Sequence, residues 1–176
     1  MAEMSKAPLL SRKGIVGAGL VLAALATVAA PLGLSALRSR YAVSMDPQWA
    51  SCLPWSTFLV RYGLPAKISR GSLVLFHDKA LDPTGYGGYP AVKYVAGVPG
   101  SVVRIEKHAV WIGGHFWGRM WLLPWMRMKH LEPLHPGTFV VPKGEYLLMG
   151  STPGSYDGRY WGFVPKKNIY GLAWPL

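Results

Sequence analysis

Ser44, which follows the uncharged segment 14–37 by seven residues, and Lys93 are candidates for a nucleophile and its base. Lys93 lies inside the apolar, strand-like run 91–95. If it points inward, desolvation disfavours the charged ammonium and favours the neutral amine. A neutral amine can take the proton of a serine hydroxyl, which is the Ser-Lys form of nucleophilic catalysis. Loop serines and exposed strand lysines are common, so the pair alone does not establish an enzyme.

Other residues that often carry chemistry form no comparable pattern. Cys52, the single cysteine, has no recognisable histidine partner and is interpreted as a buried or tolerated thiol. The histidines match no metal-ligand spacing, and Pro133 between His130 and His135 breaks helical pairing. The sequence therefore predicts no disulfide, no metal site and no cofactor.

An uncharged segment, 14–37, is long enough to cross a hydrocarbon core of about 30 Å at about 1.5 Å per residue. We expect residues 1–13 to be a basic cytoplasmic tail and 14–37 a single transmembrane anchor. The alternative is a cleaved signal peptide ending at Ala30. It is disfavoured because the apolar stretch continues and Pro31 would become the first mature residue.

Residues 38–176 have the composition of a β-rich domain. The chain is 51% hydrophobic and 15% charged, which excludes a disordered protein, and its 21 Gly and 15 Pro argue against a helical bundle. Short apolar runs alternate with Gly- and Pro-containing turns (72–76, 91–95, 101–105, 109–112, 138–141 and 145–149). The predicted fold is mainly β, with a coiled or barrel-like sheet in an extracytoplasmic domain over 38–176.

The net charge of +11 is compatible with nucleic acid or an anionic membrane as a partner. Because the domain is expected to be tethered at a membrane, we predict membrane lipid as a partner and no nucleic acid. Anionic headgroups attract nearby basic residues by roughly 1 kcal/mol each. Nucleic-acid binding would instead predict salt-dependent retention of the domain on DNA.

Five motifs follow one another along the chain: S-M-D-P (44–47), R-G-S-L-V-L-F (70–76), V-K-Y-V-A-G-V-P-G-S (92–101), V-P-K-G-E-Y-L-L-M-G (141–150) and S-Y-D-G-R-Y-W-G-F-V-P (155–165). This series resembles the type I signal peptidase family over about residues 41–171. The last motif is the most specific. The family's fold, a coiled β domain beside the membrane, agrees with the strand pattern.

The resemblance implies endoproteolysis of an exported precursor polypeptide after small residues. Ser44 matches the nucleophile and Lys93 the general base, acting through an acyl-enzyme. Met45 and Pro47 follow Ser44 in the first motif, and we expect them to lie near the substrate and the membrane. Asp157 and Arg159 match an acidic and a basic position, and we expect them to orient or support the site. The implied location is the bacterial inner membrane, with the catalytic domain in the periplasm.

Several residues depart from the family pattern. Ala42 stands where many relatives have a hydroxyl that contributes to the oxyanion hole, so the Ser44 N–H or another group must serve. Ser72 and Ser101 replace acidic residues, and Tyr94 replaces an arginine. The short chain and the segments 52–54 and 171–176 look like those of the TraF-like conjugative-transfer peptidases. That resemblance implies a pilin precursor and either hydrolysis or cyclisation.

Two functional alternatives remain at the level of sequence. The chain could be a general secretory leader peptidase, or an anchored β-domain that only binds. Separately, the Trp- and Met-rich segment 116–129 could contact lipid headgroups or pack on the β core as an insert.

Overall fold

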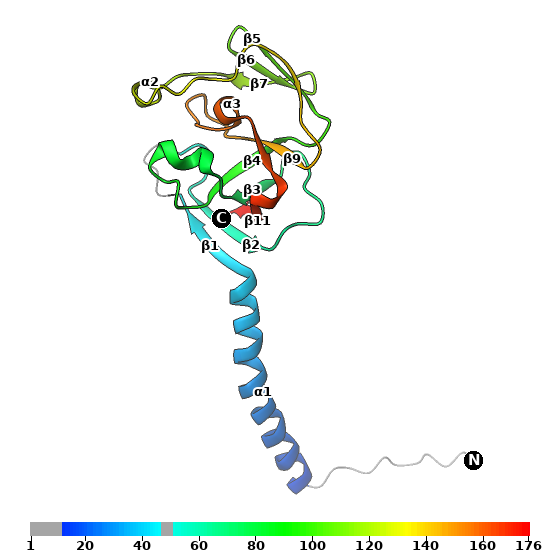
Figure 1. The fold of residues 1–176 in the computed structure, drawn as a ribbon. Coiled ribbons are helices and arrows are strands. Elements are labelled where there is room, and N and C mark those ends of the chain that lie inside the picture. The colour runs from blue at the N-terminus through cyan, green and yellow to red at the C-terminus, as the bar shows by residue number, and fades with distance from the viewer. Residues whose placement is uncertain (1–11, 47–50) are drawn as a thin grey trace, which may run out of the picture. The chain divides into compact units, whose positions relative to one another are not determined.

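The computed structural model describes residues 12–46 and 51–176, and the chain divides between Ser39 and Arg40 into two units. Helix α1 (Arg12–Arg40) is continuous through Pro31 (Figure 1). Within the described part of the chain, Leu20–Arg40 is the one candidate membrane span, judged by length and composition. The expected anchor 14–37 lies inside α1. Its bounds and the cytoplasmic placement of the N-terminus stay predictions.

The unit that begins at Arg40 contains two antiparallel sheets. The larger has the strand order β1-β2-β11-β3-β4-β9-β10. Its strands are β1 (Tyr41–Met45), β2 (Thr57–Tyr62), β3 (Leu73–Phe76), β4 (Ala91–Gly97), β9 (Glu145–Met149), β10 (Phe163–Pro165) and β11 (Ile169–Pro175). Strands β1 and β4, which carry Ser44 and Lys93, therefore belong to the same sheet. This architecture confirms the prediction of a mainly β fold.

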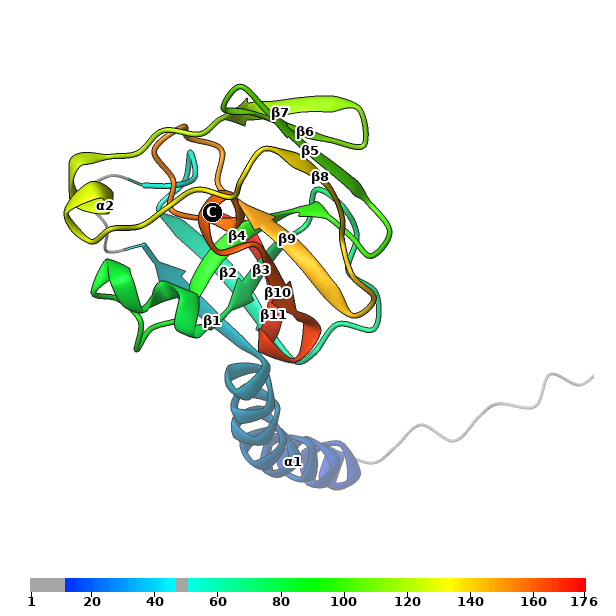
Figure 2. The ribbon, with the colours of Figure 1, turned by 45° about the horizontal axis from the view of Figure 1, so that its top comes forward.

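The smaller sheet has the order β7-β6-β5-β8. Its strands are β5 (Val102–Glu106), β6 (Ala109–Ile112), β7 (His115–Arg119) and β8 (Gly137–Val140). Figure 2 shows this sheet on the side of the larger one where β9 lies. Buried residues of β5 and β6, such as Val103 and Ile112, form one cluster with Leu147 and Met149 of β9. This apolar contact joins the two sheets.

Short helical segments lie between the strands: η1 (Lys79–Thr84), α2 (Pro124–Met128), α3 (Gly158–Trp161) and η2 (Lys166–Asn168). Pro124 begins α2, where its missing N–H costs nothing. The carboxylate of Asp157 caps α3 by accepting a hydrogen bond from the Arg159 N–H. Gly162 ends α3 at φ 81°, a conformation that favours glycine.

Strand β3 shows why the sheet is stable in this register. All four of its residues are buried, because both faces of the sheet are covered at this point. Val74 and Phe76 enter one apolar cluster, while Leu73 and Leu75 enter another. Burying each such side chain contributes roughly 1.5–3 kcal/mol, and a one-residue slip would exchange the two faces. Because β4 pairs with β3, the register of β4 is fixed as well.

The segment 116–129 divides into buried and exposed residues. Met126 is fully buried, and Leu123 and Trp125 pack with it against Tyr156 and Tyr160. This part of the segment therefore packs on α3 and the loop before it, in a cluster that contains no strand residue, and packing on the β core is not what holds it. Trp121 and Met128 are largely exposed. Contact of these two residues with lipid stays a prediction.

Candidate active site

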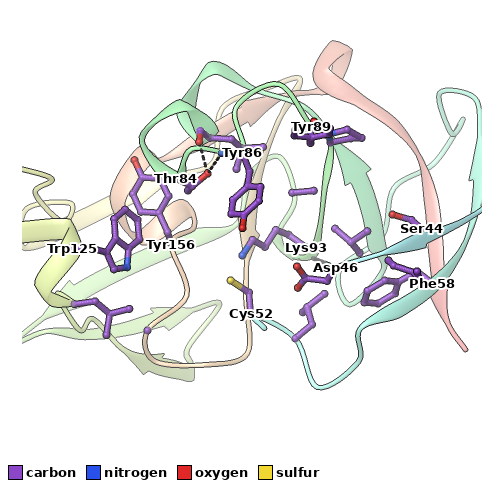
Figure 3. A pocket seen from close by; sticks show the side chains of 18 residues that line it. Ser44, Asp46, Cys52, Phe58, Thr84, Tyr86, Tyr89, Lys93, Trp125 and Tyr156 are labelled. Carbon is purple, nitrogen blue, oxygen red and sulfur yellow. Dashed lines mark hydrogen bonds between the residues drawn. The ribbon is translucent and has the colours of Figure 1, made fainter. Parts of the chain in front are cut away.

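A pocket of about 350 Å³ opens at the end of β1, within the size range of small-molecule and peptide-side-chain sites. Its wall includes Ser44, Met45 and Lys93, three of the residues singled out in the sequence. Figure 3 shows Lys93 projecting into the pocket, with Ser44 on one side of it and Trp125 and Tyr156 on the other. The fold thus brings the expected nucleophile and base to one cavity.

Ser44 lies on an edge strand. Strand β1 is first in the order of the larger sheet, and it pairs only with β2 among the described strands, with Ser44 opposite Phe58. Along β1, Ala42 and Ser44 are half-buried, whereas Val43 and Met45 are exposed. Ser44, the expected nucleophile, therefore lies on the inward face of a strand whose other edge pairs with no described strand.

Lys93 lies on a central strand and is only 3% exposed. It is on the same face of β4 as Val95, which packs in an apolar cluster with Leu81. Its Nζ donates a hydrogen bond of 2.9 Å to the Oγ of Ser155. Among the described residues, no hydrogen bond joins Lys93 to Ser44. Catalytic hydrogen bonds are often long without substrate and shorten when it binds.

Ser155 is a site residue that the sequence reasoning missed. It is buried, with 1% of its surface exposed, and its hydroxyl accepts the hydrogen bond from Lys93. Gly150 makes room for it, because a Cβ added at Gly150 would lie 2.2 Å from Ser155 Oγ. The available signal was its place at the start of the fifth motif, two residues before Asp157.

Asp157 and Arg159 form a fully buried ion pair behind the pocket. Arg159 Nη2 lies 2.6 Å from Asp157 Oδ2, and Nε lies 2.8 Å from Oδ1. The same carboxylate accepts from the Gly150 N–H at 2.7 Å, and the guanidinium donates to the carbonyls of Thr152 and Arg119. The pair thus connects the loop that holds Ser155 to α3.

The pKa values of Arg159 and Tyr156 are both raised from their usual values. Burial alone lowers the pKa of Arg159, but the hydrogen bonds and negative charge of Asp157 outweigh burial and raise that pKa. Burial also raises the pKa of the Tyr156 phenol, which lines the pocket. Arg159 is therefore a permanent cation and Tyr156 a neutral phenol at physiological pH. Neither Asp157 nor Arg159 lines the pocket, and their supporting role stays a prediction.

The structure also describes the surroundings of other residues singled out in the sequence. Met45 lines the pocket and is 71% exposed, whereas Pro47 lies outside the described residues. Cys52 also lines the pocket. In the described ranges, 12–46 and 51–176, no three His, Cys, Asp or Glu side chains are grouped so that they could hold a metal ion.

Comparison with known proteins identifies the family. Residues 15–175 match the family model described as signal peptidase, peptidase S26. The chain belongs to this family. Its match covers both motifs that carry Ser44 and Lys93.

Matches to individual relatives cover less of this S26 chain than the family model does. A probable signal peptidase I-2 of Synechocystis sp. is 29% identical over 113 residues, which is 61% of this chain and 49% of the relative. Signal peptidase I of Buchnera aphidicola from Acyrthosiphon pisum is 60% identical over 37 residues, 20% of this chain and 12% of the relative. The chain thus spans at most about half the length of these curated relatives.

One solved structure is also similar. A signal peptidase I of Enterococcus faecalis V583 is 22% identical, with a TM-score of 0.38, and the match covers 60% of this chain and 96% of that one.

Proposed function

We propose that this S26 chain is a membrane-anchored serine endopeptidase that cleaves an exported precursor with Ser44 and Lys93. The observation that carries the proposal is the pocket itself. It is lined by the serine of the first motif and the lysine of the third, and the lysine is buried. A lysine amine and a serine hydroxyl that line one cavity are the two groups that Ser-Lys catalysis needs.

The reaction would proceed through an acyl-enzyme. Ser44 Oγ attacks the scissile carbonyl carbon while Lys93 Nζ takes the hydroxyl proton. The C–N bond then breaks, and Lys93 returns the proton to the leaving amine. In the second step Lys93 takes a proton from water, or from another amine, as it attacks the ester, and the serine hydroxyl is restored.

Two groups would assist these steps. Ser155 accepts a hydrogen bond from Lys93 and so directs its Nζ into the pocket. The Ser44 N–H would donate to the oxyanion of the tetrahedral intermediate. Ala42 has no side-chain donor for that oxyanion, so the backbone must contribute more here than in relatives with a hydroxyl at that position.

The open edge of β1 suits a polypeptide substrate. An extended segment can add to an exposed sheet edge and form main-chain hydrogen bonds, which places a peptide bond beside Ser44. Ser44 follows the last residue of α1 by four residues, and four extended residues span only about 13 Å. If α1 crosses the inner membrane, cleavage takes place near the periplasmic surface.

The finer assignment is a TraF-like peptidase that matures a conjugative pilin. It is supported by the segments 52–54 and 171–176, which look like the corresponding segments of that group. Resolution of the acyl-enzyme by the substrate's own amine would give a cyclic product, which is one water lighter than the linear one. Mass spectrometry of the product separates these outcomes. General leader removal is the second candidate, favoured by the signal peptidase I relatives.

The decisive experiment uses the full-length chain co-expressed with a candidate precursor. Ser44→Ala and Lys93→Ala should each abolish precursor conversion. The exposed residues Ser56 and Lys67 provide the matched controls Ser56→Ala and Lys67→Ala, which should convert normally. Full conversion by both Ser44→Ala and Lys93→Ala would overturn the proposal. A wild-type chain that binds precursors but converts none would indicate a binding module.

A further inference from the structure

The pocket extends well beyond the residues that the proposed reaction uses. Past Lys93 its wall is formed by two segments far apart in sequence, η1 with the loop that follows it, and α2. Leu81, Tyr86, Trp125 and Tyr156 supply large side chains at this end. None of the described lining residues at this end carries a charge. A purely catalytic cavity would not need this aromatic extension.

Hydrogen bonds hold together the segments that form the aromatic end of the pocket. Lys129, at the end of α2, donates from Nζ to the Pro83 carbonyl of η1 at 2.6 Å, which joins the two segments. Thr84 Oγ1 donates to the Leu81 carbonyl and accepts from the Tyr86 N–H, so the turn that presents Tyr86 is closed (Figure 3). Preorganised walls reduce the entropy lost when a ligand binds.

The aromatic rings are arranged to receive another ring. Trp125 packs edge-on against Tyr156, with ring centroids 5.5 Å apart at 74°. Tyr156 is buried, and Trp125 is only partly covered, so Trp125 offers ring surface to the cavity. Tyr86 is 39% exposed and lies nearer to Lys93 in Figure 3. Edge-to-face and offset contacts with such rings favour an aromatic ligand by about 0.5–1.5 kcal/mol beyond burial.

We propose that Trp125 and Tyr86 are specificity-determining residues that bind an aromatic side chain of the polypeptide substrate, within a few residues of the scissile bond. The inference rests on the proposed function for the identity of the ligand as a polypeptide. It is carried by the continuity of the aromatic end with the cavity that contains Ser44 and Lys93. A small residue at the cleaved bond and a large aromatic residue nearby would then define the substrate together.

A phenylalanine scan of peptide substrates tests this directly. The probes are dye-labelled twelve-residue peptides of Ala, Ser and Gly, with Phe placed in turn at each position of an otherwise constant parent. The full-length protein in detergent micelles cleaves them, and kcat/KM is measured for each. We expect Phe at one position, or at two adjacent ones, to raise kcat/KM about tenfold over the parent, because an aromatic side chain becomes buried.

The matched variants separate recognition from folding. The readout is the ratio of kcat/KM for the preferred Phe peptide to that for the parent, taken within each variant. In Trp125→Ala this ratio should fall to about one, and Trp125→Phe should restore part of it. Trp121→Ala is the control, because Trp121 is the same residue type in the same segment, is 61% exposed and does not line the pocket. It should keep the wild-type ratio.

Binding of the same peptides to the Ser44→Ala variant, measured by fluorescence anisotropy, separates the two proposals. Cleavage with no Phe preference, or a preference that Trp125→Ala retains, would overturn the subsite and leave the peptidase standing. Phe-selective binding that depends on Trp125, without cleavage by the wild type, would keep the subsite and overturn the peptidase. Neither cleavage nor selective binding would overturn both.

Discussion

Ser44 and Lys93 line the same pocket from very different parts of the sheet. Ser44 is half-buried on the edge strand β1, and among the described residues its hydroxyl has no hydrogen-bond partner. Lys93 is 3% exposed on the central strand β4 and is bonded to Ser155, beside the Asp157–Arg159 pair. The chain thus places the proposed nucleophile at the edge of the sheet and the proposed base where the surrounding fold holds it.

This difference implies that the two residues contribute differently to activity and to stability. A change at Ser44 should remove activity and leave the fold intact. Changes around Lys93 should reduce both, because the groups that orient the lysine also hold the loop 150–157 to α3. Four measurements on variants test this contrast.

The largest effect is expected on activity at the edge strand. Ser44→Ala should lower kcat by on the order of 10⁴-fold or more, since no nucleophile remains. Its free energy of unfolding should stay within about 0.5 kcal/mol of the wild type. Kinetics and denaturant unfolding of the same preparation check both. A strongly destabilised Ser44→Ala would contradict the contrast.

The next effect is on stability at the buried pair. Asp157→Asn leaves the Arg159 charge buried without its counter-ion, so the free energy of unfolding should fall by about 3–5 kcal/mol. Glu106→Gln is the control, because it breaks the exposed Arg104–Glu106 pair, whose side chains are 52% and 56% exposed. That change should cost less than about 1 kcal/mol. Equal losses in the two variants would show that the buried network is not what stabilises this region.

A smaller effect is expected where the loop has no space. In Gly150→Ala the added Cβ would lie 2.2 Å from Ser155 Oγ and 2.8 Å from the Cys52 carbonyl, so the loop must shift. We expect a loss of stability of up to about 3 kcal/mol and a lower kcat. Gly144→Ala gives a comparison, because a Cβ there meets nothing within 4 Å and only the backbone, at φ +80°, is strained. Normal kcat in a folded Gly150→Ala would show that the position of Ser155 is unimportant.

The smallest effect is expected at Ser155, whose hydroxyl accepts the hydrogen bond from Lys93. Ser155→Ala removes the acceptor of the Lys93 hydrogen bond and should cost about 2 kcal/mol of stability. It should lower kcat more than it changes KM, because the base is displaced and the rest of the pocket remains. Ser155→Thr, which keeps a hydroxyl, should recover part of kcat. A change in KM alone would assign Ser155 to substrate binding instead.

Much of the fold could be predicted because its signals are local. The length and lack of charge of residues 14–37 are enough to predict a spanning helix, and α1 contains these residues. Six apolar runs bounded by turns correspond to strands β3, β4, β5, β6, β8 and β9. The strands β1, β2, β7, β10 and β11 were not among those runs, because their exposed and buried residues are mixed and tertiary pairing decides them.

The candidate site was predictable only in part. Ser44 and Lys93 followed from motif order, and the structure brings both to one pocket. Ser155 was missed because its role depends on a contact with Lys93, 62 positions away in sequence. Trp125 and Tyr86 were missed as pocket residues for the same reason, since α2 and the loop after η1 meet only in the folded chain.

The amino-acid sequence by itself determined the β-rich character of the domain, a helix able to cross a membrane and the residue types of a serine peptidase. These follow from local hydrophobicity, turn residues and motif spacing, which act over a few residues. Only the tertiary structure decided that Lys93 is buried, that Ser155 accepts its hydrogen bond and that an aromatic wall extends the pocket. Such properties depend on strands and loops brought together from distant segments, where packing and desolvation set the chemistry.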